Sequence, residues 1–511
     1  MKKPVRVRFA PSPTGPLHLG GVRTALYNYL FARHHGGDFV LRIEDTDQQR
    51  FVSGAEQYIC EALRWAGISP NEGVGFGDGP YAPYRQSERK AIYKEYALQL
   101  IENGKAYYAF DTAEELENLR NQLKEEGSDY LVYGPHSRSR MKNSLTLSDT
   151  EVQQMLLSGQ PYVIRFLMPA AQTVSFRDEI RGEVTFQTDV LDDKVLFKSD
   201  GMPTYHLANV VDDYLMNISH VIRGEEWLSS TPLHVLLYQA LGIADAMPSF
   251  SHIPLILRPD GKGKLSKRDG DRLGFPSFPL TWTDPLSAEV SQGYKERGFY
   301  PEAFINFLAL LGWNPGNNQE FMSPSELIES FSLEKVHKSG ARFDFEKAKW
   351  FNEHYLRQIK GSTLAEDVWK MAFEKYGAID MKYLSAVCDL MKERCTFPGD
   401  ILTKGYFFFE PIHTWDEEQW EKRHSPESID YIHLLFDKME ETGLTDAREL
   451  EQWTKEQLTV DGRKPGEIIP LLRLGLSGIM NGPGVFDIIS LWGITKTREV
   501  FKQSVTFFTK K

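Results

Sequence analysis

The first 45 residues restrict the fold of this chain more than any other segment. Alternating apolar residues predict a strand over 5–9, an apolar helical pattern follows over 17–35, and a second strand is predicted over 39–43. This order is one β-α-β unit, in which the two strands run parallel and the crossover is right-handed. Ligands bind beyond the carboxyl ends of the strands in such sheets, where we expect residues 10–15 and Glu44.

Composition excludes several classes of protein. The chain has 511 residues, which suggests about three to five domains. Its 41% hydrophobic and 25% charged residues exclude extensive disorder and a fibrous protein. No apolar stretch approaches the ~20 residues of a membrane span, and no apolar signal-peptide core follows the first residues. Three cysteines without a Cys-x-x-Cys pair argue against a disulfide scaffold and a four-cysteine zinc site. We therefore expect a cytoplasmic protein.

The net charge of −12 bears on nucleic-acid binding. It argues against indiscriminate binding, because neutralising phosphates requires clustered Lys and Arg. It leaves a specific RNA partner open, since the charge of a local surface matters more than the sum. Composition alone is therefore compatible with both an enzyme and a binding protein.

The rest of the sequence changes character twice. Residues 107–204 combine a charged helix with β-rich sequence, which predicts an α+β domain inserted into the α/β domain, whose sequence returns over 205–260. Residues 261–340 include a Pro-, Ser- and Thr-rich loop with little periodicity. Over 341–511, apolar residues recur at i, i+3 or i+4 and i+7, so this region is predicted to be all-helical, with a break near residue 400.

Two segments are candidates for binding a nucleotide. Residues 15–21 open the first helix but match neither the phosphate loop nor the dinucleotide fingerprint. A helix N-terminus with glycines still lets a nucleotide approach the backbone, and His18 can donate to a phosphate. The alternative is a glycine-containing turn with a surface histidine. Residues 262–268 hold four cations in seven residues, which suits a triphosphate; the alternative is a solvated charged loop.

Together these segments resemble the paired signatures of the class I aminoacyl-tRNA synthetases. Longer motifs resemble the bacterial glutamyl-tRNA synthetase family over nearly the whole chain: Arg8–Gly15, Leu41–Asp47, Tyr84–Arg89, Asp200–Asp213, Val221–Trp227 and Phe307–Trp313. The resemblance implies a Rossmann-like catalytic domain in two halves (1–106 and 205–260), an inserted acceptor-end-binding domain (107–204), a KMSKS-type loop with a stem-contact region (261–340), and an all-α anticodon-binding region (341–511).

The family activity would be ATP-dependent attachment of glutamate to tRNA(Glu). Glutamyl-adenylate forms first, and the glutamyl group then passes to the 3′-terminal ribose of the tRNA. The resemblance implies ATP with Mg²⁺, L-glutamate and tRNA(Glu) as partners, no membrane, and a monomer. A non-discriminating form that also glutamylates tRNA(Gln) is the alternative within the same family.

The resemblance also implies site residues. The catalytic residues would be His18, Lys264 and Lys267, and ATP would be held by His18, Gly20, Gly21, Lys264, Ser266 and Lys267. Glutamate would be held by Arg8, Ala10, Ser12, Glu44, Tyr205, Asn209 and Arg223. The chemistry fits, because two arginines can clamp the two carboxylates of glutamate and Glu44 can face its ammonium. Taken alone, Arg8 could instead be an outward-facing strand residue and Glu44 a helix cap.

The sequence departs from the family pattern in two places. Some members bind zinc through cysteines in the inserted domain, but residues 107–111 here include Ala109 and Asp111, so we predict no zinc. Residues 274–292 look longer than the family pattern, and we expect an ordered surface insertion without an assigned role.

Three other functions are alternatives to this interpretation. Glutaminyl-tRNA synthetase shares the catalytic motifs but ends in β-barrels, which the helical pattern after residue 340 opposes. A short paralogue that glutamylates a modified tRNA base lacks the anticodon region, which a 511-residue chain opposes. A non-catalytic RNA-binding relative would have no reason to keep both His18 and Lys267.

One arginine is a candidate for reading the anticodon. Arg394 follows an amphipathic helix, near the point where discriminating members of the family use an Arg to read the third anticodon base. The alternative is an arginine placed in a last helical turn because the helix dipole favours a cation there.

Overall fold

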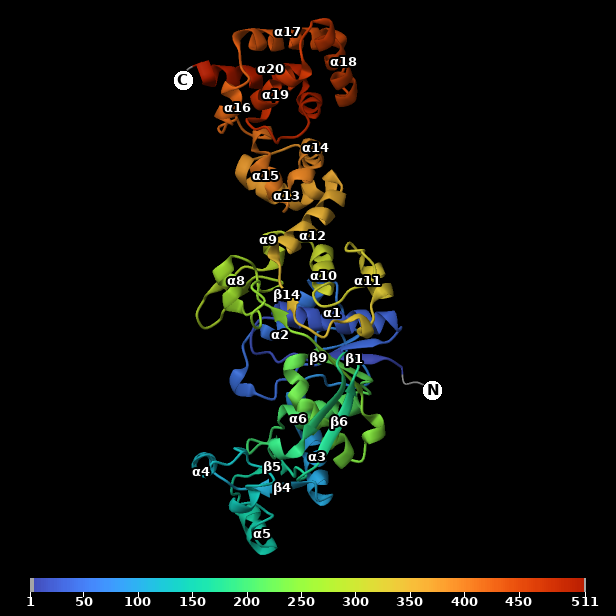
Figure 1. Ribbon diagram of the computed structural model, residues 1–511, viewed down its shortest axis with the longest axis vertical. Helices are drawn as coiled ribbons and strands as arrows, with labels where there is room; N and C mark the ends of the chain where they lie inside the picture. The colour runs from blue at the N-terminus through green and yellow to red at the C-terminus, as the bar shows by residue number, and fades with distance from the viewer. Residues whose placement is uncertain (1–3, 510–511) are drawn as a thin grey trace. The chain divides into compact units, whose positions relative to one another are not determined.

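The structure is a computed structural model that describes residues 4–509, apart from the side chain of Lys267. The chain divides between residues 348 and 349 into two compact units (Figure 1). The first unit combines strands and helices, and the described part of the second is helical. This confirms the predicted class of an α/β domain followed by an all-α region.

A parallel sheet forms the centre of the first unit. β1 (Arg6–Phe9) pairs in parallel with β2 (Asp38–Leu41), and β2 with β3 (Glu72–Gly73). A second group runs in the order β7 (Gly182–Gln187), β6 (Thr173–Asp178), β10 (Ser249–Ile253) and β9 (His220–Gly224). The Ser219 amide donates to Arg6 O at 2.9 Å, and Ser219 O accepts from the Ser249 amide at 3.0 Å. The two groups of strands therefore lie side by side.

Helices cover both faces of this sheet (Figure 1). On one face lie α1 (Leu19–His34), α10 (Pro301–Ala309) and α11 (Pro324–Ser330), and on the other α3 (Lys90–Glu102), α6 (Tyr205–Leu215) and α7 (Thr231–Ala240). The Tyr27 hydroxyl of α1 donates to Ala309 O at 3.0 Å, which ties α1 to α10. Apolar residues that recur on successive turns of these helices are buried against the sheet. Helix α2 (Ala55–Trp65) follows β2 in the chain.

The inserted segment contains a separate small sheet. β4 (Ala106–Ala109), β5 (Val163–Phe166) and β8 (Val195–Phe197) are antiparallel, and α4 (Ala113–Glu125) and α5 (Asp149–Leu157) accompany them. Leu119 and Leu123 of α4 pack on Tyr107 and Tyr133. However, the hairpin of β6 and β7, which lies inside the predicted range 107–204, joins the central sheet through pairing of β6 with β10. The insert is therefore not structurally separate along its whole length.

The segment between the sheet and the helical unit contains short strands. β11 (Ile256–Leu257) pairs with β14 (Ala341–Arg342), although the sequence predicts only helices from residue 341. Between them lie α8 (Lys267–Leu273), the hairpin of β12 (Trp282–Thr283) and β13 (Val290–Ser291), and α9 (Tyr294–Arg297). The ring centroids of Trp282 and Tyr58 are 5.3 Å apart, and the Leu280 amide donates to the Tyr58 hydroxyl at 3.0 Å. These contacts anchor residues 274–292 on α2.

From residue 349 to 509 the described chain is helical, without a strand. Helix α12 (Phe345–Gln358) spans the division between the units. The others are α13 (Gly361–Tyr376), α14 (Met381–Met391), α15 (Asp400–Lys404), α16 (Glu417–Glu421), α17 (Pro426–Thr442), α18 (Ala447–Val460), α19 (Pro465–Ser477) and α20 (Val485–Thr509). The predicted apolar face of α14, formed by Leu384, Val387, Cys388 and Met391, is buried.

A buried carboxylate on α6 ties that helix to α3 and to the segment before it. Asp212 is fully buried, and it accepts hydrogen bonds from Arg89 Nε at 2.7 Å, Tyr93 OH at 2.7 Å and Gln86 Nε2 at 3.0 Å. All three partners are donors, so the site requires an acceptor at both carboxylate oxygens. Removing one partner of a buried ion pair leaves the other charge uncompensated.

We predict that Asp212→Asn lowers the free energy of unfolding by about 3–5 kcal/mol, because an amide turns a donor toward these donors and leaves Arg89 without an anion. Urea denaturation followed by circular dichroism measures the change. The control is Glu88→Gln, which removes a half-exposed partner of Arg85 and is expected to move the midpoint far less. Equal shifts in the two variants would contradict the assignment.

Candidate active site

Backbone hydrogen bonds bring the first predicted segments together. The Arg42 amide donates to Phe9 O and the Glu44 amide donates to Pro11 O, both at 3.0 Å. The loop after β1 therefore runs beside the end of β2, at the carboxyl edge of the sheet. Ala10 and Ser12 lie on this loop, and Ser12 is exposed. This is the edge at which the β-α-β topology places a ligand.

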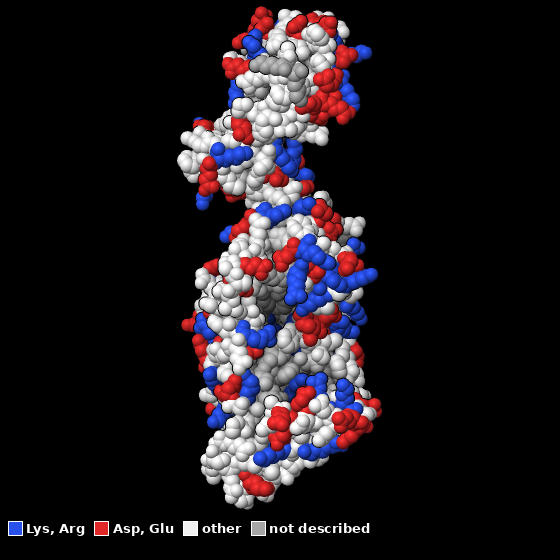
Figure 2. Space-filling view, turned by 90° about the vertical axis from the view of Figure 1, so that its left-hand side faces the viewer, with Lys and Arg blue, Asp and Glu red and all other residues white. Residues whose placement is uncertain are grey.

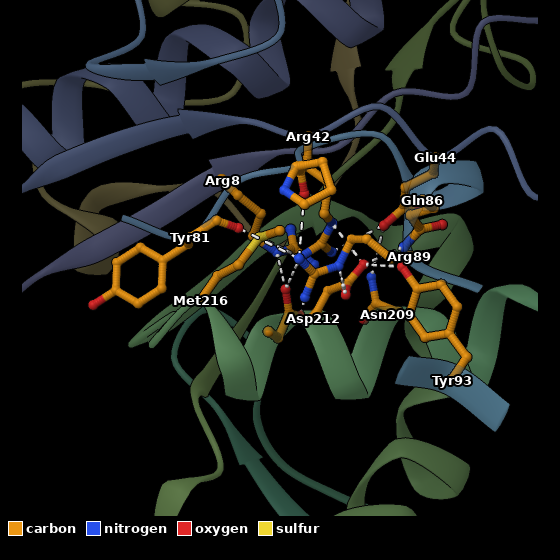
Figure 3. A network of polar contacts seen from close by, with 12 residues as sticks. Arg8, Arg42, Glu44, Tyr81, Gln86, Arg89, Tyr93, Asn209, Asp212 and Met216 are labelled. Carbon is orange, nitrogen blue, oxygen red and sulfur yellow. Dashed lines mark hydrogen bonds and ion pairs between the residues drawn. The ribbon is translucent and has the colours of Figure 1, made fainter. Parts of the chain in front are cut away.

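Arg8 of β1 and Arg42, which directly follows β2, both bind the carboxylate of Asp213 on α6; Figure 3 labels the two arginines. Arg8 donates through Nε and Nη2 to the two oxygens of Asp213, at 3.0 and 3.2 Å. Arg42 Nη1 donates to Asp213 Oδ1 at 2.8 Å. Burial raises the pKa of Asp213, but the adjacent guanidiniums outweigh burial and hold that pKa below its ordinary value. Arg8 is buried, which excludes the alternative of an outward-facing strand residue.

Glu44 lies beside this pair (Figure 3). Its Oε1 accepts from Arg42 Nη2 at 2.9 Å and from Asn209 Nδ2 at 3.1 Å. No donor within residues 4–509 bonds to Oε2. Burial raises the pKa of Glu44, against the opposing attraction of Arg42 and Arg8. Glu44 does not cap a helix, so the structure leaves one carboxylate oxygen available at the edge of the sheet.

Arg223 of β9 is surrounded by neutral groups. Its Nε donates to His252 Nε2 at 3.0 Å, Nη1 to the Tyr205 hydroxyl at 2.8 Å, and Nη2 to Thr231 Oγ1 at 2.8 Å. Only 5% of Arg223 is exposed, and no carboxylate lies within 4.0 Å of it among the residues that the structure describes. A buried guanidinium ordinarily has an anion as a partner. The site therefore has an unneutralised cation.

Three of the predicted glutamate residues, Arg8, Glu44 and Arg223, lie near Tyr205. Burial raises the pKa of its hydroxyl, and Arg223, Glu44 and Arg8 are close enough to act on that pKa as well. The ring of Tyr205 packs against Trp227, with centroids 4.5 Å apart. The structure thus brings together positions from β1, the segment after β2, α6 and β9, which are far apart in sequence.

His18 is the N-cap of α1. Its Nδ1 accepts from the Gly20 amide at 3.4 Å, and burial, followed by Lys264, lowers its pKa to about 4. The imidazole is therefore neutral near pH 7 and carries its proton on Nε2. That nitrogen is buried and has no hydrogen-bond partner within residues 4–509. An unsatisfied donor at a helix N-terminus suits a phosphate oxygen.

The two glycines after His18 have different surroundings. A Cβ on Gly21 would lie 2.5 Å from Leu17 Cδ1, so packing accounts for the absence of a side chain there. A Cβ on Gly20 would meet only His18 Nδ1, at 4.0 Å. Space therefore remains open beside Gly20, where a ligand can approach the first turn of α1.

The basic loop carries the remaining predicted nucleotide residues. Figure 2 shows Lys and Arg side chains gathered on the face of the first unit that carries α8. Lys264 Nζ lies 2.9 Å from Glu226 Oε1, and both side chains are largely exposed. Ser266 caps α8 and donates its hydroxyl to Asp269 Oδ2 at 2.6 Å. Lys267 is the first residue of α8, and its side chain lies outside the described structure.

Several residues that shape the site were not singled out from sequence. Arg42 and Asp213 belong to the quoted motifs, but their pairing with Arg8 requires the fold. His252 and its partner Asp178 gave no signal beyond a polar residue in an apolar strand. Such a residue is more often a satisfied polar group of the core than part of a site.

Two further observations concern membrane-spanning helices and metal sites. Within residues 4–509, no helix combines the length and apolar character needed to cross a membrane. No group of three or more His, Cys, Asp or Glu side chains in that part of the chain is placed to hold a metal ion.

Comparison with known proteins identifies the family. Residues 4–350 match the model "tRNA synthetases class I (E and Q), catalytic domain", and residues 363–503 match "Anticodon binding domain". The chain is 51% identical to the glutamate–tRNA ligase of Amoebophilus asiaticus over 97% of both chains, and 50% identical to that of Christiangramia forsetii over 99% of both. It resembles the crystal structure of a glutamate tRNA ligase from Elizabethkingia meningosepticum in complex with its amino acid, with a TM-score of 0.91, 48% identity and 99% of both chains covered. The chain therefore belongs to the glutamate–tRNA ligases, within the class I tRNA synthetases.

Proposed function

We propose that this chain attaches glutamate to tRNA(Glu) with ATP. The α-carboxylate of glutamate attacks the α-phosphorus of ATP, pyrophosphate leaves, and glutamyl-adenylate forms. A hydroxyl of the 3′-terminal ribose then attacks the activated carbonyl, and AMP leaves. The observation that carries this proposal is the buried Arg223, whose partners within the described chain are all neutral, and which lies, like Glu44 with its available oxygen, close to Tyr205.

The charges of the pocket match those of glutamate. Arg223 would hold the side-chain carboxylate, because its guanidinium is already desolvated and lacks an anion. Glu44 Oε2 would accept from the substrate ammonium. Arg8 uses Nε and Nη2 for Asp213, which leaves the two hydrogens of its Nη1 for the α-carboxylate. Ala10, Ser12, Tyr205 and Asn209 would complete the pocket.

ATP would lie across the N-terminus of α1. His18 Nε2 would donate to a phosphate oxygen, and Gly20 would allow the nucleotide close to the backbone. Lys264, Ser266 and Lys267 would approach the triphosphate from the basic loop, with Lys267 stabilising the leaving pyrophosphate and Mg²⁺ accompanying ATP. These groups position and stabilise charge, so no side-chain nucleophile is needed.

The inserted domain would function without zinc. Asp111 accepts from the Lys142 amide at 2.7 Å and from the Tyr133 hydroxyl at 3.0 Å, and Asn143 Nδ2 donates to the same hydroxyl at 3.0 Å. These hydrogen bonds join the segment that contains Asp111 to residues 133–143. The protein is proposed to act in the cytoplasm as a monomer.

The anticodon would be read in the helical unit. Arg394 is exposed after α14, its Nη1 donates to Leu390 O at 3.4 Å, and within the described residues it has no carboxylate partner. Burial lowers the pKa of Arg473 on α19, and Arg394 is close enough to lower it further. Two guanidiniums near each other suit the anionic backbone and base edges of RNA. The helix dipole of α14 remains the alternative reason for Arg394.

We predict that Arg223→Gln raises the KM for glutamate by more than about 10²-fold, because the substrate carboxylate loses its charged partner in a buried site. The KM for ATP is expected to stay near that of the wild type. Aminoacylation kinetics measure both values. Arg177→Gln removes an exposed Arg from β6 and serves as the control. Equal impairment toward both substrates would point to misfolding instead.

We predict that His18→Asn lowers kcat for ATP–pyrophosphate exchange by about 10²–10³-fold, the range for losing one transition-state donor. Asn preserves the capping acceptor of α1 but has no group at the position of Nε2. His18→Gln keeps a donor near that position, and its exchange rate is expected to lie much closer to that of the wild type. An Asn variant with wild-type kcat would exclude His18 from phosphate binding. The assay is run with and without tRNA.

We predict that wild type charges tRNA(Glu) far better than tRNA(Gln), and that Arg394→Gln reduces this preference. Charging of both tRNAs is measured side by side. Arg448→Gln removes an exposed Arg of α18 in the same unit and is expected to leave the preference unchanged. Efficient charging of tRNA(Gln) by wild type would instead support the non-discriminating form, and an unchanged preference in Arg394→Gln would exclude Arg394 as the discriminator.

A further inference from the structure

Arg223 is held by a chain of polar contacts that begins on a different strand. His252 lies opposite Arg223 in the register of β10 and β9, and it is fully buried. Its Nε2 accepts from Arg223 Nε at 3.0 Å, while its Nδ1 lies 2.6 Å from Asp178 Oδ2 at the end of β6. Three adjacent strands thus contribute one residue each to a carboxylate–imidazole–guanidinium chain.

The carboxylate at the start of this chain is fixed by the backbone. Asp178 Oδ1 accepts from the amides of Ile180 and Arg181 at 3.0 and 2.9 Å, and Oδ2 also accepts from the His252 amide at 3.1 Å. Burial raises the pKa of Asp178, but hydrogen bonds from His252 and from these amides outweigh it and lower the pKa. Asp178 is therefore an ionised acceptor with one orientation, and it offers no proton to His252.

The ionised carboxylate determines which imidazole nitrogen carries the proton. Because Asp178 only accepts, His252 Nδ1 must donate. Burial lowers the pKa of His252 to about 4, so near pH 7 the ring has a single proton and Nε2 presents a lone pair to Arg223. In the other tautomer, an N–H of the imidazole would face the N–H of the guanidinium. The Asp178 carboxylate thus determines that the imidazole accepts a hydrogen bond from Arg223.

The opposite side of the guanidinium is supported in a similar way. His234 Nδ1 lies 3.4 Å from Arg223 Nη1, and its Nε2 lies 3.3 Å from His206 Nδ1. Burial lowers the pKa of both histidines, so they too are neutral near pH 7. Arg223 is consequently oriented by neutral acceptors and keeps its full positive charge for a ligand.

We propose that Asp178 and His252 are positioning residues for glutamate recognition, which fix the plane of the Arg223 guanidinium so that it meets the substrate carboxylate. This inference rests on the proposed role of Arg223. Neither residue touches the substrate. A guanidinium held in one plane binds a carboxylate through two parallel hydrogen bonds without first losing rotational freedom. The inference also assigns the β6–β7 hairpin, part of the inserted segment, a function in amino-acid selection.

Two substitutions at His252 distinguish its contact with Asp178 from its contact with Arg223. Asn places an amide near the position of Nδ1, so His252→Asn can keep the bond to Asp178 but leaves Arg223 Nε without an acceptor. Gln reaches the position of Nε2, so His252→Gln can offer Arg223 an amide oxygen. We expect His252→Asn to raise the KM for glutamate by about 10- to 100-fold, the factor for losing a hydrogen bond to a charged group. His252→Gln is expected to stay within about threefold of wild type.

Further measurements distinguish positioning from a general effect on folding. The KM for ATP and the thermal midpoint are measured for each variant; the KM for ATP is expected to change little, and the thermal midpoint shows how far each variant is destabilised while it remains folded at the assay temperature. Asp178→Asn is expected to raise the glutamate KM as well, because its amide cannot satisfy all four donors around Asp178. His220→Asn, at the start of β9 and beside Phe31, is the control and is expected to leave the glutamate KM unchanged.

Arg223→Gln, measured in parallel, distinguishes failure of this inference from failure of the proposed function. If Arg223→Gln raises the glutamate KM but His252→Asn does not, the positioning role is overturned and the pocket stands. If a folded His252→Gln protein is as impaired as His252→Asn, the role of the Nε2 acceptor is overturned. If Arg223→Gln itself leaves the glutamate KM unchanged, the proposed pocket fails and this inference fails with it.

Discussion

The buried ion cluster between the sheet and α6 is the constraint on which the site depends. Arg8 lies on β1 and Arg42 directly follows the neighbouring parallel strand β2, so their charges lie close together in a buried region. Such a pair is stable only with an anion between them, and Asp213 supplies it from α6. The cluster therefore fixes where α6 crosses the sheet. Tyr205 and Asn209 of the same helix are placed against Arg223 and Glu44 as a result.

The buried charged side chains of the site are of two kinds. Arg42 and Asp213 neutralise each other within the protein. Arg223 has only neutral partners in the described chain, and Glu44 uses one oxygen for two donors. The first kind supports the fold, and the second leaves charge for a ligand. A protein that binds a substrate with separate anionic and cationic groups needs this division, because a fully neutralised pocket would have nothing to offer the charges of that substrate.

Some features of the fold and of the candidate site could be predicted from the sequence, and others could not. The alternation over residues 5–9 and the helical pattern after it determine a β-α-β unit locally, so the edge that carries Glu44 was predictable. The alternating pattern of β6 shows a half-buried strand but not which sheet it joins, so its pairing with β10 was missed. The contact of His252 with Asp178 joins residues 74 positions apart, and neither belongs to a quoted motif. The capping role of Ser266 was likewise hidden, because a Ser-x-x-Asp pattern within a basic loop also fits a phosphate contact.

The pairing of β6 with β10 has a consequence for attempts to shorten this protein. The outer part of the insert, with β4, β5 and β8, forms its own sheet, whereas β6 and β7 extend the central sheet beyond β10. A deletion of the whole segment from 107 to 204 would turn β10 into an uncovered edge strand with free amide and carbonyl groups, and such edges promote aggregation. A minimal catalytic domain would therefore have to retain the β6–β7 hairpin, which pairs with the edge of β10. The remainder of the insert could be replaced by a short linker.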